Sequence, residues 1–201
     1  GAAKTDSAAS ILLESEIFEA FVWRAAPRGT EEMMECAGAY ASFVRAQVNI
    51  KAMFYNTLNY DSTLESENRT KYLKAILEDV QPDLFMVCEL KNEAASNYLF
   101  ANAILPYKES FQKAPFKYSQ SPATDLLQMV YYNASKLTLE NTKIISTELR
   151  DINQYTFKIN DDNFSTPLRI EVYVTHLKAS TGKENRQKRY SSAFSFVREL
   201  E

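Results

Sequence analysis

The 201-residue sequence is poor in the features that mark several classes of protein. Its two cysteines, Cys36 and Cys88, allow at most one disulfide, which excludes a disulfide-rich scaffold. No apolar run reaches the roughly 18 residues that a membrane-spanning helix needs. The net charge of −3 predicts no general attraction to polyanions, although a local basic patch remains open. Only four glycines stand against twelve tyrosines and twelve phenylalanines, which indicates a sheet-containing core rich in aromatic side chains.

Residues 1–46 differ in pattern from the rest of the chain. Residues 7–26 carry apolar side chains at helical spacing, the stretch APRG interrupts them, and residues 30–46 resume a helical pattern with acidic residues in the first turn. We therefore expect a helical hairpin here, either as an appendage or as a foreign or fused segment. A helix pair that binds a partner protein is the alternative.

Residues 47–201 predict a single α+β domain. Residues 48–56 alternate between apolar and polar side chains as a strand does, and residues 66–80 show helical spacing. The continuous apolar run 83–88 is typical of a strand that is buried on both faces. A helix over 92–104 follows, and then come four strand patterns and a closing helix, at residues 126–133, 137–149, 154–159, 168–176 and 184–200. This order favours layers of helices packed on sheets.

Three of these strands run into a polar residue. Asn56 continues the apolar row of the first strand, Glu89 directly follows the buried run, and His176, the only histidine, continues the row of the last strand. Each residue also has a plainer interpretation: Asn56 as a turn residue, Glu89 as a strand-to-helix cap and His176 as a polar strand end. Because burying a polar group without a partner is costly, three of them at strand ends predict one polar site at the edge of the sheet.

The chemistry of these residues suits a divalent cation and a phosphate. A glutamate supplies the anionic oxygen that Mg²⁺ prefers, and this ion keeps several of its waters. An asparagine can orient a substrate oxygen or a neighbouring group, since it is both donor and acceptor. A histidine beside a phosphoryl oxygen can donate a hydrogen bond or a proton as charge develops.

Four stretches occur in a telling order along the chain: MFYNTLNY (53–60), PDLFMVCELKN (82–92), YVTHLKAS (173–180) and ENRQKR (184–189). In this order they resemble the endonuclease/exonuclease/phosphatase superfamily, whose fold is that of DNase I. In that family an early strand ends in Asn, a Pro-Asp strand carries the metal-binding Glu, and a late strand ends in His-Leu.

The resemblance implies a four-layered α/β sandwich over residues 47–201, with residues 1–46 as a helical appendage. It implies Asn56 and His176 as catalytic residues and Glu89 as the ligand of Mg²⁺ or Mn²⁺. The implied activity is metal-assisted attack of water on a phosphate ester, by a phosphodiesterase, nuclease or phosphatase.

The sequence also departs from the family pattern. The family continues with Gly-Asp-x-Asn after the last helix and ends near an Asp-His pair, and neither motif occurs here. Asp161 and Asn163 form an Asp-x-Asn, but they precede His176 and indicate a solvated turn. Where nuclease members carry a Glu that orients the His, this chain has Leu126 and Gln128. We therefore expect the N-terminal portion of such a domain, inactive by itself. An inactive family descendant that serves as a binding module is the alternative.

The expected partner is a phosphate-ester substrate, with nucleic acid, phosphoinositide, sphingomyelin and small phosphoesters all open. No membrane span is expected, and a second partner could bind through residues 1–46. The location is left open, with a secreted or periplasmic one slightly favoured over the cytoplasm. An unrelated α+β domain with accidental motif matches is the remaining alternative.

Overall fold

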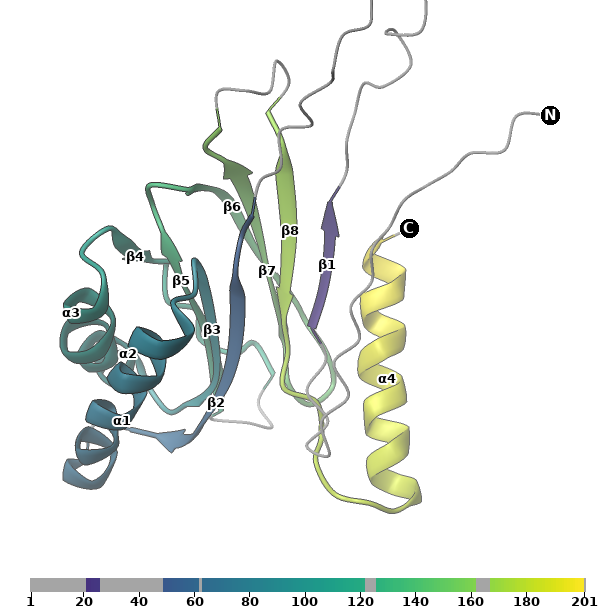
Figure 1. Ribbon diagram of the computed structural model, residues 1–201. Helices are drawn as coiled ribbons and strands as arrows, with labels where there is room; N and C mark the ends of the chain where they lie inside the picture. The colour runs from purple at the N-terminus through teal and green to yellow at the C-terminus, as the bar shows by residue number, and fades with distance from the viewer. Residues whose placement is uncertain (1–20, 26–48, 62, 122–125, 162–166, 201) are drawn as a thin grey trace, which may run out of the picture.

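The computed structural model describes residues 21–25, 49–61, 63–121, 126–161 and 167–200. Two four-stranded sheets pack face to face, with helices α1 to α3 on the outer face of one sheet and helix α4 on the outer side of the other (Figure 1). The order of layers is therefore helix, sheet, sheet, helix, which confirms the predicted four-layered α+β architecture. No helix in these described ranges is long and apolar enough to cross a membrane.

The first sheet has the strand order β2-β3-β5-β4. Strand β2 (Ala52–Tyr60) runs parallel to β3 (Leu84–Leu90), which pairs antiparallel with β5 (Leu127–Asn133). The short strand β4 (Phe111–Lys113) was not predicted from the sequence. Nearly every residue of β3 and every residue of β5 is buried, as the apolar run in β3 predicted.

Helix α1 (Leu64–Val80) connects the parallel strands β2 and β3, as crossover connections require. The helix expected over 92–104 is confirmed, but it is irregular: α2 (Glu93–Leu99) continues through a π-helical turn, η1 (Phe100–Ile104), into the short α3 (Leu105–Tyr107). Asn92 caps α2, because its side chain accepts a hydrogen bond of 2.8 Å from the Ala95 N–H.

The second sheet is antiparallel throughout, with the order β1-β8-β7-β6. Its strands β6 (Leu137–Ile145), β7 (Ile152–Ile159) and β8 (Arg169–Val174) follow the predicted patterns, and so does α4 (Lys183–Leu200).

The expected helix over residues 7–26 is wrong for its described part, because Phe21–Ala25 form strand β1 along the edge of β8. Phe, Val and Trp favour strands, and pairing satisfies the backbone groups at that edge of β8. The rest of residues 1–46 lies outside the described residues, so the hairpin and the division of the chain after residue 46 stay predictions.

Aromatic side chains fill the space around and between the sheets. Tyr131 of β5 is fully buried, stacks on Phe85 with ring centroids 5.9 Å apart, and shares a hydrogen bond of 2.9 Å with the Ser96 hydroxyl. Tyr132 of β5 meets Phe157 of β7 with ring centroids 5.0 Å apart, so this pair links the two sheets directly. These aromatic contacts thus fix the position of one sheet relative to the other, and with it the position of the strand ends.

Candidate functional site

Asn56 and Glu89 meet because β2 and β3 are parallel and in register. Asn56 lies opposite Cys88 in the β2–β3 ladder, one residue before Glu89. The Asn56 Nδ2 donates a hydrogen bond of 3.0 Å to Glu89 Oε1. The predicted neighbourhood of the two polar side chains at one edge of the sheet is confirmed.

Glu89 has an unusual backbone. Its φ of 63° is left-handed, a region that residues with a side chain adopt at a cost of about 1–3 kcal/mol. Both ladders of β3 lose their regular register here, between Asn56 and Tyr60 on one side and between Val87 and Leu90 on the other. Such irregularities redirect a side chain and are common beside active sites. The plainer reading of Glu89 as a helix cap is wrong, since Asn92 is the cap of α2.

A turn after Asn56 holds the Glu89 carboxylate. Leu58 and Asn59 are both left-handed, each with a φ of 53°. The Leu58 N–H donates to Asn56 Oδ1 at 2.8 Å, and the Asn59 N–H donates to Glu89 Oε2 at 3.0 Å. Asn56 is therefore a turn residue as well as a partner of Glu89. Glu89 Oε1 thus accepts from Asn56 Nδ2 and Oε2 accepts from the Asn59 N–H, and each oxygen keeps a further lone pair.

Arg69 of α1 stabilises this turn by hydrogen bonds to its backbone. Its Nη1 donates to the carbonyl oxygens of Thr57 at 2.8 Å and of Leu58 at 3.1 Å. Its guanidinium also lies over the Tyr60 ring, 5.5 Å from the centroid. The turn that positions Glu89 is thus tied to the crossover helix as well as to the sheet.

His176 reaches the same place from the second sheet. It follows β8, is only 2% exposed, and its Nε2 lies 3.4 Å from Glu89 Oε1. Its Nδ1 is buried and has no hydrogen-bond partner among the described residues. Burial, and after it the positive charge of Arg150, lowers the pKa of His176 to about 4 against the opposing effect of Glu89. The imidazole is therefore neutral at neutral pH.

Arg150, which the sequence reasoning did not single out, completes the cluster. It lies just before β7, half-buried, and its Nη1 donates to the carbonyl oxygens of His176 at 3.2 Å and of Leu177 at 3.0 Å. Burial lowers the pKa of its guanidinium, and the nearby negative charge of Glu89 opposes that shift. A basic residue between two strand patterns resembles a solvated loop residue, so the sequence carried no signal for this role.

Gln128 and Asp161 belong to two other features of the sequence. Gln128, at the position where nuclease members carry the His-orienting Glu, donates from Nε2 to the Asp151 carbonyl oxygen at 3.0 Å. Asp161 follows the end of β7 that is remote from Arg150, and Asn163 lies outside the described residues. Gln128 lies on β5 opposite the break in the ladder at Glu89, and its side chain is hydrogen-bonded to the backbone next to Arg150.

The donor atoms at this site suit Mg²⁺ or Mn²⁺, rather than a metal ion whose ligands all come from the protein. Nowhere in the described part of the chain do three His, Cys, Asp or Glu side chains gather to hold an ion. Mg²⁺ does not need such a cage, because it commonly binds through one or two carboxylates plus waters and substrate phosphate oxygens. Glu89, with lone pairs left on both oxygens, is the described side chain that meets this requirement.

Comparison with solved structures gives the fold. The chain is similar to an endonuclease/exonuclease/phosphatase from Bacteroides vulgatus, with a TM-score of 0.52, 14% identity, and coverage of 76% of this chain and 60% of that one. A humanized D. rerio TDP2 gives a TM-score of 0.49 at 15% identity, covering 75% of this chain and 56% of that one. An endonuclease/exonuclease/phosphatase family protein from Bacteroides thetaiotaomicron gives 0.49 at 12% identity, with 75% and 58% covered.

The chain therefore spans between 56% and 60% of the length of these three solved chains. No protein-family model matches the sequence, and a comparison with curated protein sequences gives no match. The fold statement rests on the structural likeness to the Bacteroides vulgatus protein.

Proposed function

Since the chain has the DNase I-like endonuclease/exonuclease/phosphatase fold over three quarters of its length, we propose that it hydrolyses a phosphate ester with the help of Mg²⁺ or Mn²⁺. The observation that carries the proposal is the convergence of Asn56, Glu89 and His176 from two different sheets. The left-handed backbone of Glu89 supports it further, because strained residues cluster at functional sites.

Each residue has a role that its surroundings support. Glu89 would hold the metal ion, which would supply Lewis-acid stabilisation of the charge that develops on the phosphoryl group. Asn56 and the Asn59 N–H hold the carboxylate in one orientation. His176, neutral at neutral pH, can donate one hydrogen bond to a phosphoryl oxygen. Arg150 fixes the backbone that carries His176, and its positive charge would lie beside a phosphate bound at this site.

Turnover by the full-length protein tests this proposal. The substrates are bis(p-nitrophenyl) phosphate, p-nitrophenyl phosphate and an end-labelled oligonucleotide, each with Mg²⁺, with Mn²⁺ or with EDTA. We expect hydrolysis of at least one ester that EDTA abolishes and that His176→Asn reduces by about 100-fold or more, as general acid–base and electrostatic contributions of this size imply. Hydrolysis that persists in EDTA, or that His176→Asn leaves unchanged, contradicts the assignment.

The second candidate is a binding module without turnover. It is favoured by one observation, that His176 Nδ1 has no orienting partner among the described residues. Such a protein would bind the oligonucleotide or another phosphate ester at the same residues and release it unchanged. Binding that Arg150→Met weakens, with no product after prolonged incubation in Mg²⁺ or Mn²⁺, would favour this candidate over the first.

A further inference from the structure

A cavity lies at the ends of strands β2 and β3 that are remote from Glu89. It measures about 510 Å³ and is lined by three lysines, an aspartate, a tyrosine and two amide side chains. Its residues Lys51 and Asp83 immediately precede the two parallel strands, whereas Asn56 and Glu89 lie towards the other ends. Asn56 lies five positions after Lys51 and Glu89 six after Asp83, which corresponds to roughly 17–20 Å at the usual rise. The cavity is therefore separate from the candidate catalytic site.

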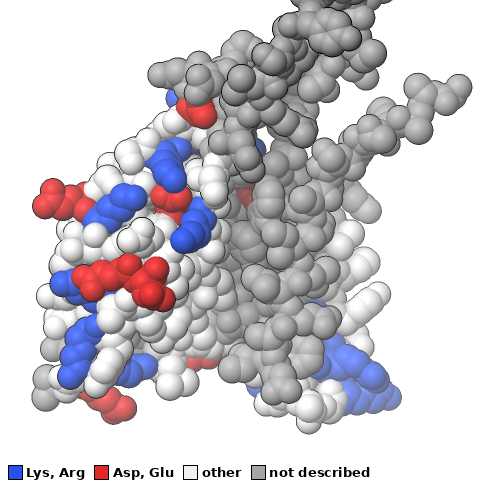
Figure 2. All heavy atoms as spheres, viewed as in Figure 1, with Lys and Arg blue, Asp and Glu red and all other residues white. Residues whose placement is uncertain are grey.

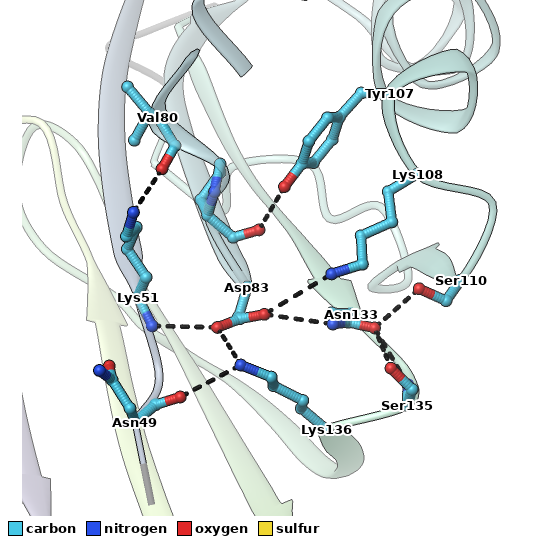
Figure 3. A network of polar contacts seen from close by, with 11 residues as sticks. Asn49, Lys51, Val80, Asp83, Tyr107, Lys108, Ser110, Asn133, Ser135 and Lys136 are labelled. Atoms are coloured by element: carbon cyan, nitrogen blue, oxygen red, sulfur yellow. Dashed lines mark hydrogen bonds and ion pairs between the residues drawn. The ribbon is translucent and has the colours of Figure 1, made fainter. Parts of the chain in front are cut away.

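Asp83 is the centre of the polar network around this cavity (Figure 3). It is 5% exposed; its Oδ2 accepts hydrogen bonds from the Lys51 N–H at 3.2 Å and from Lys136 Nζ at 2.7 Å, and its Oδ1 accepts one from Asn133 Nδ2 at 3.2 Å. Burial by itself would raise the pKa of Asp83, but hydrogen bonds from Lys136, Asn133 and Lys51 outweigh it and lower the pKa. Asp83 is thus a carboxylate that is already paired with one ammonium group.

The other two ammonium groups of the lining form no hydrogen bond with the Asp83 carboxylate. Lys108 Nζ forms an ion pair with Asp83 Oδ1 at 3.9 Å, which is too long for a hydrogen bond. Lys51 Nζ donates 2.8 Å to the Val80 carbonyl oxygen, which leaves its charge uncompensated among the described residues. With three lysines and one aspartate, the lining carries two more positive than negative charges.

We propose that this cavity binds a small molecule that carries a phosphate monoester. A phosphate monoester is close to a dianion at neutral pH, which matches the excess of two positive charges. Lysine ammonium groups are common partners of phosphate, and the cavity volume lies in the range of small-molecule sites, so it has room for an organic group beside the phosphate.

The shape and the surrounding charge favour a small ligand over a nucleic-acid strand. A strand is tracked by basic residues along a groove, whereas these lysines surround a single hollow. Figure 2 shows acidic side chains interspersed among the basic ones on the visible face of the molecule, and the chain has a net charge of −3.

Titration calorimetry of residues 1–201 tests the proposal, with glycerol 3-phosphate and inorganic phosphate as separate probes. In EDTA, which removes the metal ion on which the proposed catalytic site depends, we expect one site for glycerol 3-phosphate, and binding about tenfold or more weaker in Lys108→Gln. The matched control is Lys74→Gln, since Lys74 is 39% exposed, as is Lys108, and lies 3.7 Å from Glu78 in a comparable ion pair. Lys74→Gln should bind as the wild type does. Binding of inorganic phosphate but not of glycerol 3-phosphate would overturn the assignment of a monoester ligand.

A second pair of variants separates this cavity from the catalytic site. Arg150→Met should leave glycerol 3-phosphate binding unchanged, and Lys108→Arg should retain it, because the charge is kept. If Lys108→Gln does not fold, as judged by its circular dichroism, Lys51→Gln replaces it with the same expected loss. The proposal is overturned if no probe binds, or if Arg150→Met abolishes binding while the lysine variants bind normally. That last outcome would assign the phosphate to the catalytic site.

Discussion

The Glu89 carboxylate and the His176 imidazole join the two sheets at one end, with Glu89 Oε1 lying 3.4 Å from His176 Nε2. Glu89 belongs to β3 of the first sheet, and His176 follows β8 of the second. The site therefore exists only while the two sheets keep their relative position. The aromatic contact between Tyr132 and Phe157 is one of the contacts that fix that position.

Glu89→Gln should abolish tight binding of Mn²⁺ without unfolding the chain. The amide keeps the shape of the side chain but loses the anionic oxygen that a hard cation prefers. We expect the affinity for Mn²⁺, measured by electron paramagnetic resonance, to fall about 100-fold or more, beyond the loss that an indirect partner of a metal ligand causes. Glu78→Gln, the same change at an exposed residue of α1, is the control and should bind as the wild type does. Equal affinities for Glu89→Gln and wild type would exclude Glu89 as the ligand.

Arg69→Met should weaken Mn²⁺ binding indirectly, through the turn whose carbonyl groups Arg69 bonds. Without the guanidinium, the carbonyl groups of Thr57 and Leu58 lose their donor, and the turn that holds Glu89 loosens. We expect a loss of about tenfold in affinity and of about 1–3 kcal/mol in the free energy of unfolding. Arg69→Lys should recover part of both. A role confined to stability would lower the free energy of unfolding and leave the Mn²⁺ affinity unchanged.

The Asp83 network should stabilise the fold in a pH-dependent way. Its pKa is lowered from the ordinary value of 3.8, so around that pH the unfolded chain binds more protons than the folded chain. The stabilisation is therefore complete above about pH 5 and is lost as the pH falls below 3.8. Urea unfolding should show the wild type more stable than Asp83→Asn by about 1–3 kcal/mol at pH 7, with a smaller difference at pH 3. A difference that is the same at both pH values would contradict this account.

Phe157→Ala should destabilise the fold by about 3–5 kcal/mol, because it opens a cavity between the sheets at a fully buried residue. Phe194→Ala on α4 is the matched control, since Phe194 is 54% exposed and its loss should cost about 0.5 kcal/mol or less. Chemical denaturation measures both values. Similar losses for the two variants would show that the contact between the sheets does not hold them in place.

The sequence predicted those parts of the fold that depend on local patterns. The apolar run of β3 and the helical spacing of α1 are strong periodic signals, and both elements form where they were expected. Strand β1 was missed because its five residues also fit a helical pattern, and pairing with β8 decides between the two. Strand β4 is too short to produce a pattern.

The site was predictable in its side chains but not in its backbone. Asn56 and His176 extend apolar rows and Glu89 follows an apolar run, so the pattern predicted a strand end at each. That prediction is wrong for two of them, because Asn56 lies inside β2 and Glu89 inside β3, where the ladders lose their register. The left-handed φ of Glu89 depends on the turn at Leu58 and Asn59, and no sequence pattern reports it. The lysine-lined cavity draws its residues from distant segments, each of which resembles an ordinary solvated surface.

The position of a bound Mn²⁺ ion tests the central claim most directly. Crystals grown with Mn²⁺ and measured near the manganese absorption edge would show the ion as an anomalous difference peak. We expect one strong peak within about 2.0–2.6 Å of a Glu89 carboxylate oxygen, the range of divalent metal–oxygen bonds, on the side that faces His176 and Arg150. The same crystals of Glu89→Gln should lack it. A strong peak remote from Glu89, or one that persists in Glu89→Gln, would contradict the claim that Asn56, Glu89 and His176 form one metal-dependent site.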